Sequence, residues 1–305
     1  MAVLATSLSL PGVRANSTED WAKCLSIEKI PPSERISGCT AALASRSDSW
    51  AYSRAYYLRG QAHFDEQNFE AAVADVSQFL HSYPNNVQGL QVRAAAYFRQ
   101  RNFDPAIADY TRVIEIEPKG SFAYIYRGDA YRAKGELDRG IADYSKAIEI
   151  NPTFAFAYFG RAMIHWQRGS LSQSLADFDE AGRLNPKSAY AALWRDIIAR
   201  RSDQPSRLAD VATHLDMTKW PAPIVNLFLG TLTSQQVLDA ADDSNPEKKR
   251  SKVCEANFYV AELALQRGAR DDARRSLELA AADCPKPFVE GWAAAIELKT
   301  LRASP

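Results

Sequence analysis

The sequence has little of what most enzymes and nucleic-acid-binding proteins need. It contains four histidines, none in a metal-binding spacing, and it has no GxSxG elbow and no glycine-rich phosphate loop. Lysine plus arginine and aspartate plus glutamate both number 37, so no excess positive charge is available to neutralise phosphates. No apolar run approaches the ~18–20 residues that a membrane-spanning helix needs. We therefore expect no enzymatic activity, cofactor, metal site, nucleic-acid binding or membrane span.

Cysteine is also scarce, and the four that are present fall into two local pairs. Cys24 and Cys39 form one pair, and Cys254 and Cys284 form the other, without any CxxC or Cys/His metal spacing. We expect each pair to form a disulfide that joins the two helices of a hairpin. Such bridges are typical of an oxidising compartment.

The N-terminal segment fits export in part. An apolar stretch is followed by Val13-Arg14-Ala15, so residues 1–15 resemble the end of a cleaved signal peptide, although the positive n-region is missing. The alternative for this segment is a disordered tail. We expect a periplasmic or otherwise exported protein; the alternative is a cytoplasmic protein with four free thiols.

Four prolines recur at intervals of 34 residues, at Pro84, Pro118, Pro152 and Pro186. Within the units that begin at residues 53, 87, 121 and 155, large and small apolar residues recur with helical spacing. The large ones include Tyr56, Leu90, Tyr124 and Tyr158, and the small ones include Gly60, Ala94, Gly128 and Ala162. This pattern resembles the tetratricopeptide repeat (TPR) family. The resemblance implies an all-α fold, a right-handed α-solenoid of helical hairpins that stack to bury their apolar faces.

An arginine and an aspartate also recur in every unit, on opposite helices of the hairpin. The pairs are Arg59 with Asp75, Arg93 with Asp109, Arg127 with Asp143, and Arg161 with Asp177. The favoured interpretation is a set of structural ion pairs within a repeat or between neighbouring repeats, because guanidinium suits part-buried bidentate pairing. The alternative is a charged surface that binds a ligand.

The segments around the repeats predict capping and inserted helices. We expect N-terminal capping helices over residues 16–50 and four repeat units plus a following helix over 53–201. A non-repeat helical insert over 202–253 would follow, and then a fifth repeat-like unit with a closing helix over 254–305. The run Glu247-Lys248-Lys249-Arg250 is interpreted as a solvated loop.

The C-terminal half resembles a narrower group, the NlpI-type TPR proteins of the bacterial envelope. The similarity lies in Trp220-Pro221, Ile224-Val225, Phe228-Leu229-Gly230, the run Ala256-Asn257-Phe258-Tyr259-Val260 and the closing Phe288-Val289-Glu290. It implies an adaptor that binds periplasmic proteases or cell-wall hydrolases and that forms homodimers. This chain has no lipobox cysteine near its N-terminus, so a soluble periplasmic form is expected.

In the TPR family the first helix of each hairpin lines a concave groove. The resemblance places six aromatic side chains there as partner-binding residues: Tyr57, Phe98, Phe122, Phe156, Phe159 and Trp166. Uncharged aromatic anchors suit a peptide or helix of another protein. The open alternative is that some of them pack in the core or are covered by the C-terminal segment.

Two functions from different classes follow from these patterns. The first is a non-catalytic adaptor or scaffold of the bacterial cell envelope that binds a protease or peptidoglycan hydrolase. The second is a structural component of an envelope assembly or secretion system that uses the solenoid to oligomerise. A cytosolic TPR scaffold is a further alternative.

Overall fold

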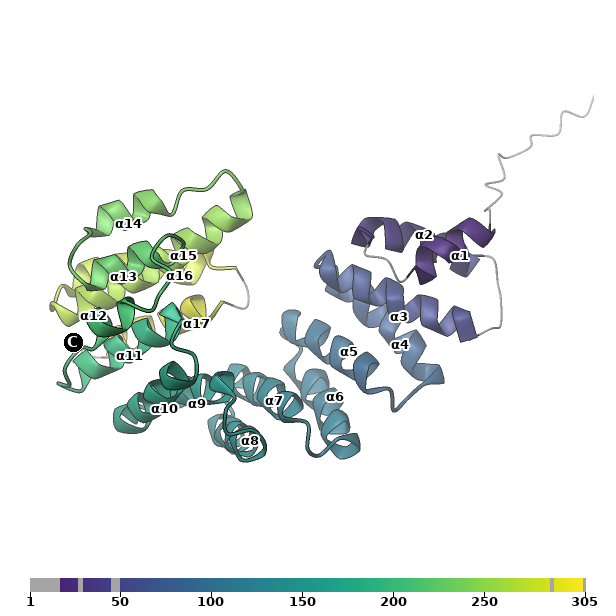
Figure 1. Cartoon of the computed structure of the whole chain (residues 1–305), viewed down its shortest axis with the longest axis horizontal. Coiled ribbons are helices and arrows are strands. Elements are labelled where there is room, and N and C mark those ends of the chain that lie inside the picture. The colour runs from purple at the N-terminus through teal and green to yellow at the C-terminus, as the bar shows by residue number, and fades with distance from the viewer. Residues whose placement is uncertain (1–16, 27–29, 45–49, 286–287, 304–305) are drawn as a thin grey trace, which may run out of the picture. The chain divides into compact units, whose positions relative to one another are not determined.

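The computed structural model describes residues 17–26, 30–44, 50–285 and 288–303. These residues form seventeen helices and no strand, which confirms the all-helical class predicted from the sequence (Figure 1). The chain divides into two compact units, Met1–Pro118 and Lys119–Pro305. Residues 1–15, for which we predicted an export signal, lie outside the described residues.

The first unit consists of three helical hairpins. Its helices are α1 (Ser17–Leu25), α2 (Pro32–Ala44), α3 (Trp50–Asp65), α4 (Phe69–Ser82), α5 (Val87–Arg99) and α6 (Phe103–Ile116). Each helix packs against the next one in the chain, so the hairpins stack. Small residues allow the close approach: a β-carbon on Gly60 would lie 2.6 Å from Cγ2 of the buried Val76.

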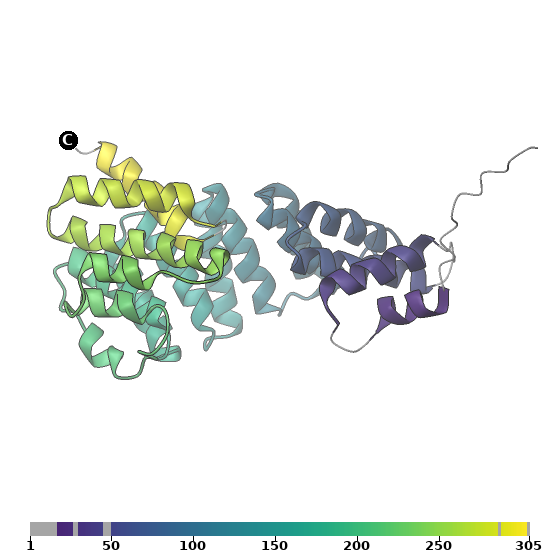
Figure 2. The ribbon, with the colours of Figure 1, turned by 90° about the horizontal axis from the view of Figure 1, so that it is seen from above.

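The second unit contains two further repeat hairpins, a helix that continues the stack, three short helices, a fifth repeat-like hairpin and a closing helix. They are α7 (Ser121–Lys134), α8 (Leu137–Ile150), α9 (Ala155–Gln167), α10 (Leu171–Leu184), α11 (Ala189–Arg201), α12 (Leu208–Ala212), α13 (Ala222–Phe228), α14 (Ser234–Ala240), α15 (Pro246–Gln266), α16 (Arg270–Asp283) and α17 (Val289–Ala303). Figure 2 shows the fifth repeat-like hairpin, α15 and α16, with its two helices side by side.

The core of the second unit lies around α11. Trp194 on this helix is fully buried and contacts the rings of Trp166, Phe178 and Phe258. These partners come from α9, α10 and α15, so the core joins the repeat hairpins to the C-terminal hairpin. Helix α11 is thus buried on most of its surface, because it has repeats on one side and the C-terminal helices on the other.

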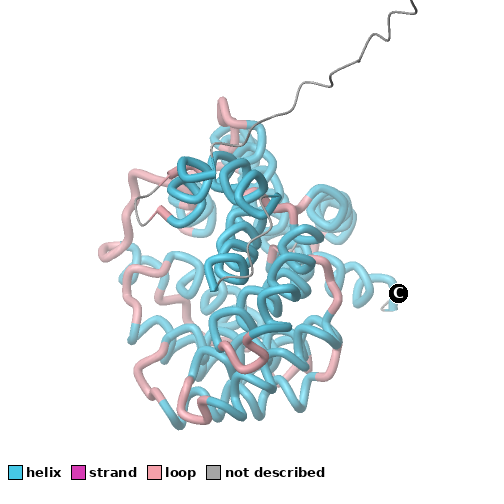
Figure 3. The backbone as a smooth tube through the Cα atoms, turned by 90° about the vertical axis from the view of Figure 1, so that its right-hand side faces the viewer, coloured by secondary structure: helices cyan, strands magenta, loops and turns pink. Residues whose placement is uncertain are grey.

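Short loops join the helices of each repeat hairpin (Figure 3). The turns contain one residue in the left-handed conformation, and glycine adopts it at Gly135 and Gly169 with φ of 89° and 74°. The corresponding residues in the first two repeats are Gln67 and Arg101, with φ of 59° and 65°. Gln67 and Arg101 therefore adopt a left-handed backbone conformation, which costs a non-glycine residue about 1–2 kcal/mol.

The charged run Glu247-Lys248-Lys249-Arg250 corrects one prediction. We expected a loop, but the run forms the first turns of α15, which begins at Pro246. The side chain of Asn245 accepts hydrogen bonds from the backbone N–H groups of Glu247 and Lys248, at 3.0 Å each. Because proline is favoured in the first helical turn and Asn245 caps the helix, the segment continues the helix despite its polarity.

Candidate protein-interaction surface

The recurring arginine and aspartate of each repeat lie face to face across their hairpin. In the first repeat Nε and Nη2 of Arg59 donate to the two carboxylate oxygens of Asp75, both at 2.7 Å. The other three pairs repeat this bidentate geometry at 2.7–2.8 Å. The hydrogen bond to Asp75 raises the pKa of Arg59, and the aspartates are only 6–7% exposed. The pairs therefore join the two helices of each hairpin.

The third guanidinium nitrogen links neighbouring hairpins. Nη1 of Arg93 donates to the hydroxyl of Ser77 at 3.2 Å, and Nη1 of Arg161 donates to that of Ser145 at 3.0 Å. The sequence interpretation missed this contact, although a hydroxyl residue recurs 16 positions before each of these arginines. Each such arginine therefore stabilises both a hairpin and its junction with the preceding one.

Arg195 on α11 shows the importance of the contact with the preceding hairpin. Arg195 occupies the corresponding position, but no repeat helix follows α11 to supply a paired aspartate. Its Nε instead donates to Asp179 of the preceding hairpin at 3.0 Å, and its Nη1 donates to the carbonyl of Pro205 at 3.0 Å. Asp179 stands where Ser145 stands one repeat earlier, so a carboxylate replaces the hydroxyl where the guanidinium would otherwise lack a charged partner.

Two of the six predicted partner-binding aromatics are strongly exposed. Phe122 is 55% and Phe156 is 69% exposed, at the N-terminal ends of α7 and α9. Phe154 contacts both, at ring-centroid distances of 4.7 Å and 6.0 Å, and Tyr126 stacks on Phe122 at 6.4 Å. We call Phe122, Tyr126, Phe154 and Phe156 the aromatic ridge. Sequence reasoning missed Tyr126 and Phe154, because neither occupies a groove position of the repeat.

Trp166 is a correction to the predicted site, because it is only 5% exposed. Its ring lies between Trp194 of α11 and Trp292 of α17, at 5.2 Å and 5.9 Å. The guanidinium of Arg132 lies over Trp292, at 4.5 Å from the ring centroid. The closing helix thus covers the surface that Trp166 was expected to offer. Phe159 is part-buried and packs edge-on against the core residue Phe178 at 5.3 Å.

The two predicted residues of the first unit also differ from each other. Tyr57 lines a groove of about 360 Å³ together with Arg54, Phe79 and Tyr83. Its ring contacts Phe79 at 5.0 Å, and its hydroxyl accepts a hydrogen bond from Gln61 at 2.8 Å. Phe98 packs against Phe103 at 5.7 Å and is part-buried. Tyr57 therefore lines an open groove of this unit, whereas Phe98 packs within its own hairpin.

Both cysteine pairs form disulfides. Cys24–Cys39 joins α1 to α2 with the α-carbons 4.5 Å apart, and Cys254–Cys284 joins α15 to the end of α16 with the α-carbons 4.9 Å apart.

Two histidines lie beside the repeat aspartates. His63 lies 3.9 Å from Asp75 and His165 lies 3.8 Å from Asp177, and burial lowers the pKa of both imidazoles. They pack as aromatic residues of the hairpins.

Among the residues the structure describes, no group of three or more His, Cys, Asp or Glu side chains is arranged to hold a metal ion. The described helices also include none with the length and apolar character needed to cross a bilayer.

Comparison with known families decides what the repeats are. The tetratricopeptide repeat model matches residues 53–86 and 87–119, and a TPR repeat model matches residues 128–169. The chain contains tetratricopeptide repeats. This supports a protein–protein interaction scaffold, and no enzyme family was found. No curated protein matches this sequence significantly.

Solved structures agree with the fold of the repeats. A tetratricopeptide repeat protein from Parabacteroides merdae has a TM-score of 0.58 and 14% identity, covering 89% of this chain and 92% of its own. MamA (residues 41 to the end) from Desulfovibrio magneticus has a TM-score of 0.50 and 17% identity, covering 58% of this chain and 98% of its own. At these identities the likeness concerns the fold alone.

Proposed function

We propose that this protein is a non-catalytic scaffold that holds an apolar segment of another protein on the aromatic ridge. The observation that carries the proposal is the exposure of Phe122 and Phe156, at 55% and 69%, within one continuous aromatic cluster. Contiguous exposed apolar surface marks interaction sites in soluble proteins, and aromatic side chains dominate the energetics of interfaces.

Burial of the exposed rings of the aromatic ridge by a partner provides hydrophobic free energy for binding. Covering the exposed parts of Phe122 and Phe156 contributes about 2–4 kcal/mol of hydrophobic free energy, before the entropic cost of association. The rings contact each other, so their orientation is largely set before a partner binds. An amphipathic helix or an extended apolar segment fits such a row of aromatic side chains.

Site-specific photo-crosslinking in the native cell tests the ridge. A photoreactive amino acid replaces Phe156 in one variant and Leu279 in a control, because Leu279 on α16 is also exposed, at 51%. We expect a defined protein to crosslink from position 156 and to be absent from position 279. The combined change Phe122→Ala and Phe156→Ala, in a chain without the photoreactive residue, should abolish co-purification of that protein while helicity by circular dichroism stays unchanged.

The other outcomes of this experiment are informative. The same set of proteins at both positions would contradict a specific ridge. A crosslink from position 156 to a second copy of the chain would favour the alternative function, a component that oligomerises through its repeats.

We further propose that the scaffold works in the bacterial cell envelope and presents a protease or peptidoglycan hydrolase to its client. Support comes from the two disulfides, since such bridges persist in oxidising compartments, and from the resemblance of the C-terminal half to NlpI-type proteins. Alkylation of thiols in intact cells, followed by mass measurement, should find all four cysteines protected. Four alkylated cysteines would place the scaffold in the cytosol.

A further inference from the structure

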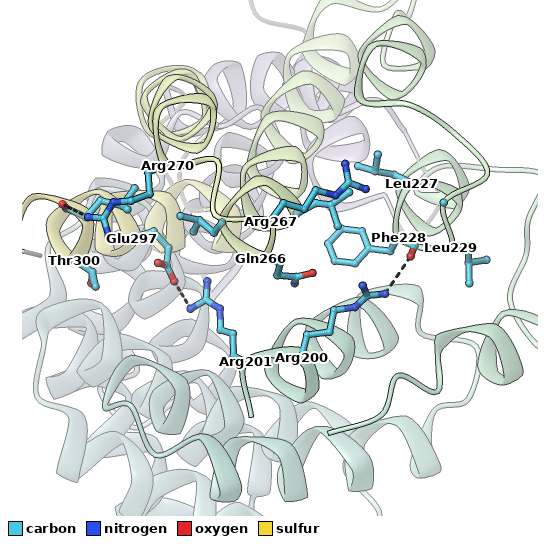
Figure 4. A pocket seen from close by; sticks show the side chains of 14 residues that line it. Arg200, Arg201, Leu227, Phe228, Leu229, Gln266, Arg267, Arg270, Glu297 and Thr300 are labelled. Atoms are coloured by element: carbon cyan, nitrogen blue, oxygen red, sulfur yellow. Dashed lines mark hydrogen bonds and ion pairs between the residues drawn. The ribbon is translucent and has the colours of Figure 1, made fainter. Parts of the chain in front are cut away.

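The second unit contains a cavity of about 690 Å³ that the aromatic ridge does not use (Figure 4). The C-terminal ends of α11, α13, α15 and α17 line it, together with the beginning of α16. Its volume is in the range of sites that bind small molecules or short peptide ends. Apolar side chains form part of its wall, notably Leu227, Phe228, Leu263 and Leu301.

Four arginines also line the cavity, and three of them are engaged within the unit. Arg200 donates to Asp196 at 2.7 Å and to the carbonyl of Phe228 at 3.2 Å. Arg201 donates to Glu262 and Glu297 at 2.5 Å and 2.7 Å. Arg270 donates to the carbonyl of Leu301 at 3.2 Å. These contacts neutralise the carboxylates and the partial negative charge at the helix ends.

Arg267 is the exception. It follows the last residue of α15, and its guanidinium has no hydrogen bond or ion pair among the described residues. Its side chain is exposed at the cavity (Figure 4). The charge of Arg267 is therefore available to an anionic group that enters the cavity, and a guanidinium is well suited to a carboxylate.

Gln266 supplies a second unsatisfied group, next to Arg267. Both polar atoms of its carboxamide are shielded from solvent and have no hydrogen-bond partner among the described residues, and the side chain lines the cavity (Figure 4). A buried polar group without a partner costs about 1–3 kcal/mol. Ligand binding would therefore include a change of the Gln266 side-chain rotamer that brings this carboxamide to the ligand. One donor and one acceptor side by side complement a peptide unit.

We propose that this cavity binds the C-terminal end of a polypeptide whose last residue is apolar. The terminal carboxylate pairs with Arg267, the last peptide unit bonds the carboxamide of Gln266, and the apolar side chain packs on Leu227, Phe228 and Leu263. A ligand of this class would pair with the Arg267 guanidinium, form hydrogen bonds with the Gln266 carboxamide and cover the apolar part of the cavity wall. The site uses none of the ridge residues and does not depend on the proposed ridge function.

Calorimetric titration with a matched pair of peptides tests the proposal. The probes are acetyl-alanyl-alanyl-leucine as the free acid and the same peptide as the C-terminal amide. We expect the acid to bind and the amide to bind about tenfold more weakly, as the loss of one charge-assisted hydrogen bond predicts. Arg267→Gln should weaken binding of the acid about tenfold and leave binding of the amide nearly unchanged.

Two further variants separate the site from general effects. Gln266→Leu should weaken both peptides, because it removes the bond to the peptide unit. Arg274→Gln is the matched control on the exposed face of α16 and should change neither affinity. Phe122→Ala with Phe156→Ala should also change neither, so failure of the ridge and failure of this site are distinguishable. Equal affinity of acid and amide, insensitivity to Arg267→Gln, or no binding of the acid at millimolar concentration would overturn the proposal.

Discussion

Four glutamates are buried where α15 and α17 meet, and they share few cations. Glu255 and Glu262 on α15 and Glu290 and Glu297 on α17 are each at most 6% exposed. Arg201 pairs with Glu262 and Glu297.

The other two glutamates accept hydrogen bonds from neutral groups. Tyr190 and Trp220 donate to Glu255 at 2.7 Å and 2.8 Å, and Tyr259 donates to Glu290 at 3.3 Å. Burial, with the nearby charge of Glu255, raises the pKa of Glu290 to about 7.

Replacement of Glu290 tests this consequence at the residue scale. Because its folded pKa lies above the unfolded value near 4.5, the folded state binds the proton more tightly, and stability is lost as pH rises from about 4.5 to about 7. Glu290→Gln, which keeps a neutral side chain, should raise the free energy of unfolding at pH 8 by on the order of 1–3 kcal/mol and have little effect at pH 4.5. Urea unfolding at several pH values measures it.

The matched control for this change is Glu278→Gln, on the exposed face of α16. It should leave the pH profile of unfolding unaltered. A Glu290→Gln profile parallel to that of the wild type would show that Glu290 is ionised in the folded protein.

Close helix packing is the feature of the repeat hairpins at the element scale. In the hairpin of α9 and α10, two glycines differ in their surroundings. A β-carbon on Gly160 would lie 2.3 Å from Cε1 of Tyr144, whereas one on Gly182 would meet nothing within 4 Å. Tyr144 is fully buried and its hydroxyl donates to Asp129 at 2.7 Å, so its ring has little freedom to move.

These two glycines form a matched pair of alanine substitutions. Gly160→Ala should destabilise the second unit by about 1–3 kcal/mol, because the added methyl group overpacks the junction with α8. Gly182→Ala should stabilise it by about 0.5–1 kcal/mol, because alanine favours the interior of a helix. Thermal unfolding followed by circular dichroism measures both changes. Equal shifts of the same sign would contradict the packing of Gly160 on Tyr144.

At the scale of the whole molecule, each compact unit carries one disulfide. The Cys24–Cys39 bridge closes 15 residues in the first unit, and the Cys254–Cys284 bridge closes 30 residues in the second. Closing a loop restricts the unfolded chain, and loops of these lengths correspond to about 3–4 kcal/mol in the chain-entropy description. The bridges therefore stabilise the two units separately.

Removal of one bridge at a time tests this separation. Changing Cys254 and Cys284 to serine should lower the free energy of unfolding of the second unit by about 2–4 kcal/mol. Hydrogen exchange read amide by amide should show lower protection in residues 119–285 and little change in the first unit. The reciprocal serine pair at Cys24 and Cys39 is the control. A uniform loss of protection from either pair would mean that the units unfold together.

The repeats could be predicted from the order of residues along the chain alone. The 34-residue period, the small and large apolar positions and the recurring arginine and aspartate all depend on neighbours within about one repeat, so periodicity predicts helices, hairpins and Arg–Asp pairs such as Arg161–Asp177. Local signals also suggested the two cysteine pairs. Local signals predicted the structure less well where they conflicted. In the first turns of α15 the charged run suggested a loop, whereas Asn245 and Pro246 favour the start of a helix.

Which aromatic side chains remain available to a partner depends on packing between segments that are far apart in the chain. Phe122 and Trp166 both occupy groove positions of a repeat, yet Phe122 is exposed while Trp166 is buried against Trp292. Trp292 lies 126 residues further along the chain, and no local pattern records that α17 returns to cover α9. Burial is a property of what packs on a residue, and here the covering segment comes from the other end of the unit. The cavity beside Gln266 and Arg267 arises in the same way, because five separate helices bring it together.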